Sequence, residues 1–269
     1  MTPFALAFAR PLFAIVSALP FLTNALSAAE PFQTHRHDEH EFSIDIPSGW
    51  VPLPAAKLGE MTQALKAMSS AATFAYSHGY QRDSGPPYPI FPYVLIQVNN
   101  RQRIPEREVA NLSKSRAAVE EGMRSVQNAR NSTVSGARLG EMVYDTNAHI
   151  IWLNMELQVA GVGPARGLTG MVLTEKGFIQ VNCYAVQAEF PALVETFEKI
   201  IRSVQVSEKL RYQPGRGGTF SLRALNFGRV GKSAIIGGIA GGVIGLVFAL
   251  MKRRQKPPAS PPTGPPPLP

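Results

Sequence analysis

The first half of the chain alternates between strand-like and helix-like spacing of its hydrophobic residues. Phe42, Ile44 and Ile46 occupy every second position with polar residues between them, and this pattern predicts a half-buried strand. Apolar residues at three- and four-residue spacing follow and predict a helix with one apolar side: Leu58, Met61, Leu65 and Met68. Residues 93–100 predict a second strand.

Proline marks two boundaries in this half of the chain. A proline- and aromatic-rich loop is predicted over residues 81–92, directly before the second strand. Pro105 stands where helices often begin. The apolar residues behind it keep helical spacing and predict a long second helix, with Arg116 inside the series: Val109, Leu112, Val119, Met123 and Val126.

The second half of the chain predicts consecutive strands and then one helix. A short strand is expected at residues 140–146, and a hairpin that turns at Gly177 is expected between residues 165–174 and 177–186. The clearest strand places five apolar residues on one face: Ile151, Leu153, Met155, Leu157 and Val159. The final helix carries an unbroken apolar stripe: Phe190, Leu193, Val194, Phe197, Ile200, Ile201 and Val204.

This order of elements predicts an α+β fold. Strands that follow one another through hairpin turns favour an antiparallel sheet, and amphipathic helices must cover a sheet to bury their apolar sides. We therefore expect an antiparallel sheet sandwiched between helices, together with one C-terminal transmembrane helix that is described below.

Three stretches of this domain resemble the PsbP-like family. They are FSIDIPSGW near the start, GFIQVNCYA in the central hairpin and FEKIIRSVQV at the end, and the resemblance covers about residues 40 to 207. The family includes the photosystem II extrinsic protein, a Ran-binding protein and many bacterial secreted proteins. The resemblance implies a sheet between helices and a binding role, and it brings no catalytic residue onto this chain. The loop at residues 81–92 and the membrane anchor are not part of the family pattern.

The first 29 residues predict a secretory signal peptide. Arg10 is followed by an apolar run over residues 11–22 and by small residues before Ala29, the expected cleavage position. An uncleaved signal anchor is the alternative, although Pro11 and Pro20 interrupt a continuous helix. Residues 30–208 then form the exported PsbP-like domain, on the periplasmic or extracellular side of a cell membrane.

A second apolar segment, residues 233–251, predicts a transmembrane helix. Its 19 residues carry no charge, and a helix of that length spans about 28 Å, close to the roughly 30 Å of a hydrocarbon core. Residues 209–232 are a basic, glycine-rich juxtamembrane linker, and residues 252–269 a basic, proline-rich cytoplasmic tail. The motif GRVGKS before the span is not a nucleotide-binding loop, because Asn226 stands where that loop needs its first glycine.

The basic surplus of the chain lies beside this span. The formal net charge is +8, but residues 30–208 contain 16 Lys and Arg against all 19 Asp and Glu, a net charge of −3. Ten of the remaining basic residues flank the predicted helix. This distribution favours anionic membrane lipid as a partner and argues against nucleic acid. The proline-rich tail is either a solvated end or a PxxP ligand for an internal partner.

Glycines inside the span predict close helix packing. Gly237, Gly241 and Gly245 stand four residues apart, as do Gly238 and Gly242. Small residues at this spacing let helices approach closely in lipid, so we expect self-association or packing on a partner helix. The alternative is that glycine is simply frequent in spanning helices.

Histidine supplies the candidate chemistry of the exported domain. His35, His37 and His40 lie within seven residues that also hold three carboxylates, and they are candidate ligands for zinc or copper as a flexible clamp. A solvated arm before the first strand is the alternative. No cofactor is indicated, and the single cysteine, Cys183, lies on the apolar side of its predicted strand, as a buried structural residue does.

These observations predict a single-pass membrane protein whose exported domain serves binding or assembly. Serine-hydrolase, zinc-protease and β-lactamase motifs are absent from the sequence, so an enzyme is not expected. A binding patch is predicted from four aromatic residues of the loop region: Tyr80, Tyr88, Phe91 and Tyr93. Two alternatives stay open, namely an enzyme or metal-binding protein with an unrecognised cleft, and a structural anchor that oligomerises through its glycines.

Overall fold

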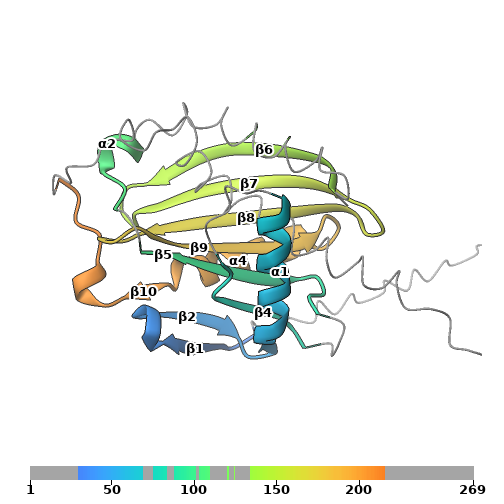
Figure 1. Ribbon diagram of the computed structural model, residues 1–269, viewed down its shortest axis with the longest axis horizontal. Coiled ribbons are helices and arrows are strands. Elements are labelled where there is room, and N and C mark those ends of the chain that lie inside the picture. Colours follow the sequence, from blue (N-terminus) through green and yellow to red (C-terminus); the bar gives the residue numbers. More distant parts are fainter. Residues whose placement is uncertain are drawn as a thin grey trace, which may run out of the picture.

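Two antiparallel sheets make up most of the domain. The computed structural model describes residues 30–68, 75–83, 88–100, 103–109, 120, 124 and 134–215 (Figure 1). The large sheet has seven strands, in the order β3 Trp50–Pro52, β4 His78–Arg82, β5 Tyr93–Asn99, β9 Phe178–Val186, β8 Gly163–Leu173, β7 Ile150–Val159 and β6 Val134–Asp145. The small sheet has the order β1 Phe32–His37, β2 Phe42–Pro47 and β10 Gln205–Val206.

Helix α4, Phe190–Arg202, covers one face of the large sheet. Its buried residues Phe190, Leu193, Phe197, Ile200 and Ile201 form one core with apolar residues of that face and with the inward side of β2. Pro191 stands in its first turn, where a missing N–H costs no hydrogen bond. The apolar stripe expected from the sequence is thus confirmed from Phe190 to Ile201, and Val204 lies just beyond the helix.

Helix α1, Ala55–Met68, lies against the opposite face, so the large sheet stands between α1 and α4 (Figure 1). A Cβ atom at Gly79 of β4 would lie 3.1 Å from side chains of both Leu58 in α1 and Leu95 in β5. The glycine therefore allows α1 to pack closely on the sheet. The short helix α2, Glu106–Val109, packs on the same face through Val109, beside Met171 and Phe178. The expected α+β fold with a sheet between helices is confirmed.

Four short strands were not expected from the sequence. β1, β3, β4 and β10 have between two and six residues, and the first three residues of β1 are all exposed. Such short strands give little hydrophobic pattern of their own and form because a longer neighbour pairs with them. β2 also pairs with β1 and β10 rather than with the large sheet.

The longer strands follow the expected pattern. β7 alternates buried and exposed side chains over Leu153 to Val159, and β8 and β9 are joined by a tight turn in which Gly177 N donates to Thr174 Oγ1 at 2.9 Å. Strand β6 begins at Val134, earlier than expected, with irregular pairing between Val134 and Gly136 and between Leu139 and Met142. Of the long helix expected after Pro105, the structure describes α2 and two single residues, and the remainder lies outside the described residues.

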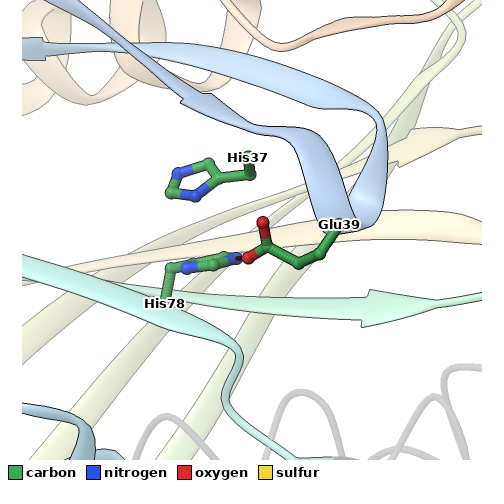
Figure 2. Close-up of side chains that lie close together, drawn as sticks. All are labelled: His37, Glu39 and His78. Atoms are coloured by element: carbon green, nitrogen blue, oxygen red, sulfur yellow. Dashed lines mark ion pairs between the residues drawn. The ribbon is translucent and has the colours of Figure 1, made fainter.

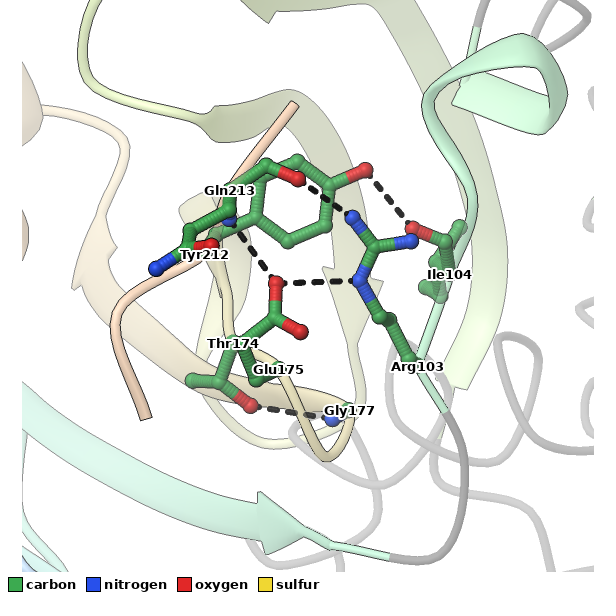
Figure 3. A network of polar contacts seen from close by, with 7 residues as sticks. All are labelled: Arg103, Ile104, Thr174, Glu175, Gly177, Tyr212 and Gln213. Atoms are coloured by element: carbon green, nitrogen blue, oxygen red, sulfur yellow. Dashed lines mark hydrogen bonds and ion pairs between the residues drawn. The ribbon is translucent and has the colours of Figure 1, made fainter. Parts of the chain in front are cut away.

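The chain leaves the domain through a polar network that we call the C-terminal clamp: Arg103, Glu175, Tyr212 and Gln213 (Figure 3). Arg103 donates from Nε to Glu175 Oε1 at 3.0 Å and from Nη2 to the Gln213 carbonyl at 2.6 Å. Gln213 N donates to the same Glu175 oxygen at 2.9 Å, and the Arg103 guanidinium lies 4.7 Å from the Tyr212 ring centroid. Packed structure therefore continues past Glu208 to Gln213.

No helix within the described residues is long and apolar enough to cross a membrane. The predicted signal peptide at residues 1–29, the predicted span at residues 233–251 and the predicted tail all lie outside the described residues. These predictions, including the packing role of Gly237, Gly238, Gly241, Gly242 and Gly245, stay predictions.

Candidate functional site

Three side chains of types that can bind a metal ion meet where the β1–β2 hairpin approaches strand β4 (Figure 2). His37 is the last residue of β1, Glu39 lies in the 3-10 turn η1, Asp38–His40, and His78 is the first residue of β4. Glu41 ends the turn with a left-handed backbone, φ 56°, and sends the chain back into β2. We call these three residues the histidine corner.

The two imidazole rings of the corner stack on each other. The ring centroids of His37 and His78 lie 3.6 Å apart, with 29° between the planes. Tyr80, two residues along β4 on the same face as His78, places its hydroxyl 3.0 Å from His37 Nε2. The tyrosine therefore engages one ring nitrogen of His37 and leaves the other for a further partner.

Glu39 brings a carboxylate to the same place. Its Oε1 lies 3.4 Å from His78 Nε2, within ion-pair distance, although His78 Nε2 makes no hydrogen bond within the described residues. The side chain of His78 is 16% exposed and that of Glu39 is 60% exposed. One ligand atom from each of His37, Glu39 and His78 lies within 4.8 Å of the other two.

Burial keeps these imidazoles neutral near pH 7. Desolvation is the main cause that lowers the pKa of His78 to about 4, and the neighbouring His37 acts in the same direction while Glu39 opposes the shift. The pKa of His37 is also lowered, mainly by burial, and again Glu39 acts in the opposite direction. A neutral imidazole keeps the lone pair that a metal ion needs.

The structure regroups the histidines expected from the sequence. His37 lies beside His78 and Glu39. His35 lies two residues earlier in β1, with its ring 4.8 Å from that of Tyr80. His40 stands edge-on to His78 at 5.4 Å and is not one of the three converging ligands. β1 pairs with β2 along its whole length, so His35 and His37 lie in a strand and not in an arm before the first strand; metal binding by His35, His37 and His40 together stays a prediction.

His78 was not among the histidines expected from the sequence to bind a metal ion. The signal that was available is the alternation of His78 and Tyr80 in HGYQR, which places both side chains on one face of a strand. Their approach to His37 depends on how the two sheets pack, which no local pattern reports.

The four aromatic residues proposed as a binding patch do not form one surface. Tyr80 and Tyr93 are buried, with 2% and 0% of their surface exposed, and they lie on opposite faces of the large sheet because Tyr80 pairs with Val94. Tyr88 and Phe91 are half-buried. The expectation is therefore wrong for Tyr80 and Tyr93.

The single cysteine, Cys183, is fully buried, and burial raises the pKa of its thiol. Both features are those of a structural cysteine.

Comparison with solved structures finds proteins of related shape, among them the following three. Cyanobacterial PsbP (CyanoP) from Synechocystis sp. PCC 6803 is 11% identical with a TM-score of 0.44, covering 70% of this chain and 99% of its own. The Ran-binding protein Mog1p from Saccharomyces cerevisiae is 5% identical with a TM-score of 0.36, covering 66% and 96%. LpqN, a cell envelope biogenesis protein from Mycobacterium tuberculosis, is 12% identical with a TM-score of 0.33, covering 66% and 91%.

Two of these three are of the kinds named by the sequence resemblance, a PsbP and a Ran-binding protein. No protein-family model matches the chain, and no curated protein matches it. Likenesses at these identities and scores carry no argument about function, so the proposals below rest on the residues of this chain.

Proposed function

We propose that this chain is a membrane-anchored binding module whose exported domain takes up a transition-metal ion at the histidine corner. One observation carries the proposal: ligand atoms of His37, Glu39 and His78 converge within 4.8 Å although His37 and Glu39 come from the β1–β2 hairpin and His78 from the large sheet. The membrane anchor and the export of the domain are expectations from the sequence that the proposal includes.

The ligand set selects a class of metal. Two imidazoles and one carboxylate suit zinc, copper or nickel ions, whereas calcium and magnesium prefer oxygen ligands alone. Ligand atoms around a tetrahedral zinc ion lie about 3.4 Å apart, given zinc–ligand distances of about 2.0–2.1 Å. Glu39 Oε1 and His78 Nε2 already lie 3.4 Å apart, and no separation among the three ligand atoms exceeds 4.8 Å, so a movement of at most about 1.4 Å brings them to zinc-binding spacing. Three protein ligands leave one position for water or for a group of a partner.

Titration calorimetry of the full-length protein in detergent with zinc chloride tests this proposal. We expect one high-affinity site per chain in the wild type and loss of that site in His78→Gln. His35→Gln is the matched control, because it removes a histidine of the same strand that lies outside the converging three. A site that survives His78→Gln but disappears in His35→Gln would favour chelation by the N-terminal histidines instead.

A protein partner is the second part of the proposed role. The binding module is expected to act with another membrane component, through the open metal position or through the predicted transmembrane helix. Gentle extraction from the native membrane, crosslinking and mass spectrometry would identify a stoichiometric partner. Recovery of only the chain itself would favour the alternative of an oligomerising structural anchor.

A further inference from the structure

The histidine corner lies at the same end of the domain as the segment through which the chain leaves it. Ser207 N donates to the Glu41 carbonyl at 3.0 Å, and Lys209 pairs with the Glu41 carboxylate. Val206 of β10 pairs with Phe42, the first residue of β2 after the turn. In Figure 1 the blue turn between β1 and β2 and the orange segment after β10 lie together at the left end of the molecule.

The two ends of the domain are well separated along strand β8. The turn after β8 belongs to the end with the histidine corner, because Glu175 N donates to the Leu210 carbonyl at 2.9 Å. The turn before β8, at residues 160–162, marks the other end. β8 has 11 residues, so the two turns lie about 34 Å apart at the rise of an antiparallel strand.

The chain that leaves beside the histidine corner leads to the predicted transmembrane helix. Residues 216–232 connect the last described residue to that span, and a chain of this length reaches at most about 60 Å when fully extended. Anionic lipid attracts the four basic residues of this connection, Arg216, Arg223, Arg229 and Lys232. We therefore expect the end with the histidine corner to face the membrane surface.

The charges around the corner nearly balance without a metal ion. Its turn contributes the carboxylates of Asp38, Glu39 and Glu41, and the first two are exposed. Lys209 lowers the pKa of Glu41 through a hydrogen bond, and Lys176 from the turn after β8 contributes to the same effect. Lys209 and Lys176 are both exposed. These three carboxylates and two ammonium groups sum to a charge of −1.

We infer that metal binding at the histidine corner docks this end of the domain onto the anionic lipid headgroups of the membrane that anchors it. The inference rests on the proposed metal site and on the predicted span. A divalent ion changes the local charge from −1 to +1, so repulsion of Asp38 and Glu39 by the headgroups gives way to attraction, which Lys176 and Lys209 increase. The fourth position of the ion is open to a headgroup phosphate oxygen.

Energy transfer from the domain to labelled lipid measures the docking. The full-length protein is placed in nanodiscs of phosphatidylcholine, with or without phosphatidylglycerol, that contain an acceptor-labelled lipid. A donor dye is attached at Gln205→Cys in β10, beside the corner, or at Ala160→Cys at the other end. Both positions are exposed, whereas the native Cys183 is buried and does not react. Zinc chloride is then added, and calorimetry of the same proteins measures zinc binding.

We expect zinc to raise the transfer from position 205, and not from position 160, in discs that contain phosphatidylglycerol. Two added charges near an anionic surface increase the ratio of docked to undocked domain about thirtyfold, and high salt should remove most of this increase. His78→Gln is expected to show no rise, which excludes zinc bound to the lipid alone. Lys176→Gln should lower the docked ratio about fivefold with unchanged zinc binding. Arg138→Gln, which removes an exposed charge near the other end, should dock like the wild type.

The outcomes separate this inference from the proposed metal site. Zinc binding in calorimetry without a change in transfer would overturn the docking and leave the metal site standing. Absence of zinc binding would overturn both. High transfer from position 205 before zinc is added, with no further rise, would show that docking does not depend on the metal. An equal rise in discs of phosphatidylcholine alone would contradict attraction to anionic headgroups.

Discussion

The imidazole ring of His37 stacks on that of His78, although one belongs to the small sheet and the other to the large sheet. The contact joins two parts of the domain through uncharged rings. Burial is the main cause that lowers the pKa of both rings, and a charge on His37 lowers the pKa of His78 in addition.

Acid is therefore expected to destabilise the metal-free domain. Histidine in the unfolded chain has a pKa of about 6.5, whereas His78 in the folded domain has a pKa of about 4. Between these values the unfolded state binds more protons, so the free energy of unfolding falls as the pH decreases from about 6.5 towards 4. Urea unfolding with a chelator at several pH values across this window measures the loss.

His78→Gln should show a smaller loss over the same window, because its side chain does not titrate. Glu39→Gln serves as the control, since Glu39 opposes the downward shift of the His78 pKa and its removal leaves the cause of the loss in place. Equal pH dependence in wild type and His78→Gln would contradict the assignment.

Tyr80 is expected to support metal binding without contacting the ion. Its hydroxyl lies 3.0 Å from His37 Nε2 and holds that ring in place. Loss of such an outer partner typically costs about 10- to 100-fold in metal affinity. Calorimetry of Tyr80→Phe with zinc measures the change, and Tyr88→Phe, which removes a hydroxyl from a half-buried tyrosine outside the corner, should keep the wild-type affinity. An unaltered affinity in Tyr80→Phe would mean that the ring is held by packing alone.

The C-terminal clamp is expected to secure the chain where it leaves the domain. Arg103→Ala removes hydrogen bonds to Glu175 and to the Gln213 carbonyl from a site where both charged side chains are largely buried. We expect a loss of about 1–3 kcal/mol in the free energy of unfolding and faster hydrogen exchange at Gln213 N.

An exposed ion pair supplies the matched control for the clamp. Arg138 lies 3.9 Å from Glu156, and their side chains are 84% and 50% exposed. Arg138→Ala should therefore cost less than about 1 kcal/mol. Similar losses of unfolding free energy in the two variants would show that the C-terminal clamp stabilises the domain no more than a surface ion pair does.

Close packing of α4 on β8 is testable at one glycine. A Cβ atom at Gly170 would overlap the side chain of Ile201, which is fully buried in α4. Gly170→Ala is therefore expected to destabilise the domain by about 1–3 kcal/mol through overpacking. Gly59→Ala in α1 meets nothing within 4 Å and is expected to stabilise by about 0.5–1 kcal/mol, as thermal or urea unfolding would show. A neutral Gly170→Ala would mean that α4 is seated differently on the sheet.

The sequence predicted the elements in which the spacing of hydrophobic side chains shows which side of the element is buried. Leu153 to Val159 alternate because one face of β7 is buried, and Phe197, Ile200 and Ile201 recur at helical spacing because α4 buries one side. Phe32, Gln33 and Thr34 show no such pattern, since all three are exposed. Strand β1 exists through its pairing with β2, and a pairing partner is a tertiary property.

The sequence also did not predict which polar residues are buried. Gln180 and Asn182 alternate with apolar residues in GFIQVNCYAV, and such a pattern normally means one solvated face. In the structure both faces of β9 are buried, so Gln180 and Asn182 lie in the interior of the domain. The histidine corner shows the same limit, because only the packing of two sheets brings His78 to His37.

Self-association through the predicted transmembrane helix is the remaining expectation. Gly241 stands at the middle of the series Gly237, Gly241 and Gly245, where a larger side chain would separate two closely packed helices. Gly241→Leu should lower the amount of crosslinked oligomer in detergent, while the unfolding of the two-sheet domain stays as in the wild type. Val243→Leu is the matched control, because at 100° per residue it lies on the side of a helix away from the glycines. An oligomer that persists in Gly241→Leu would assign the contact to another part of the chain.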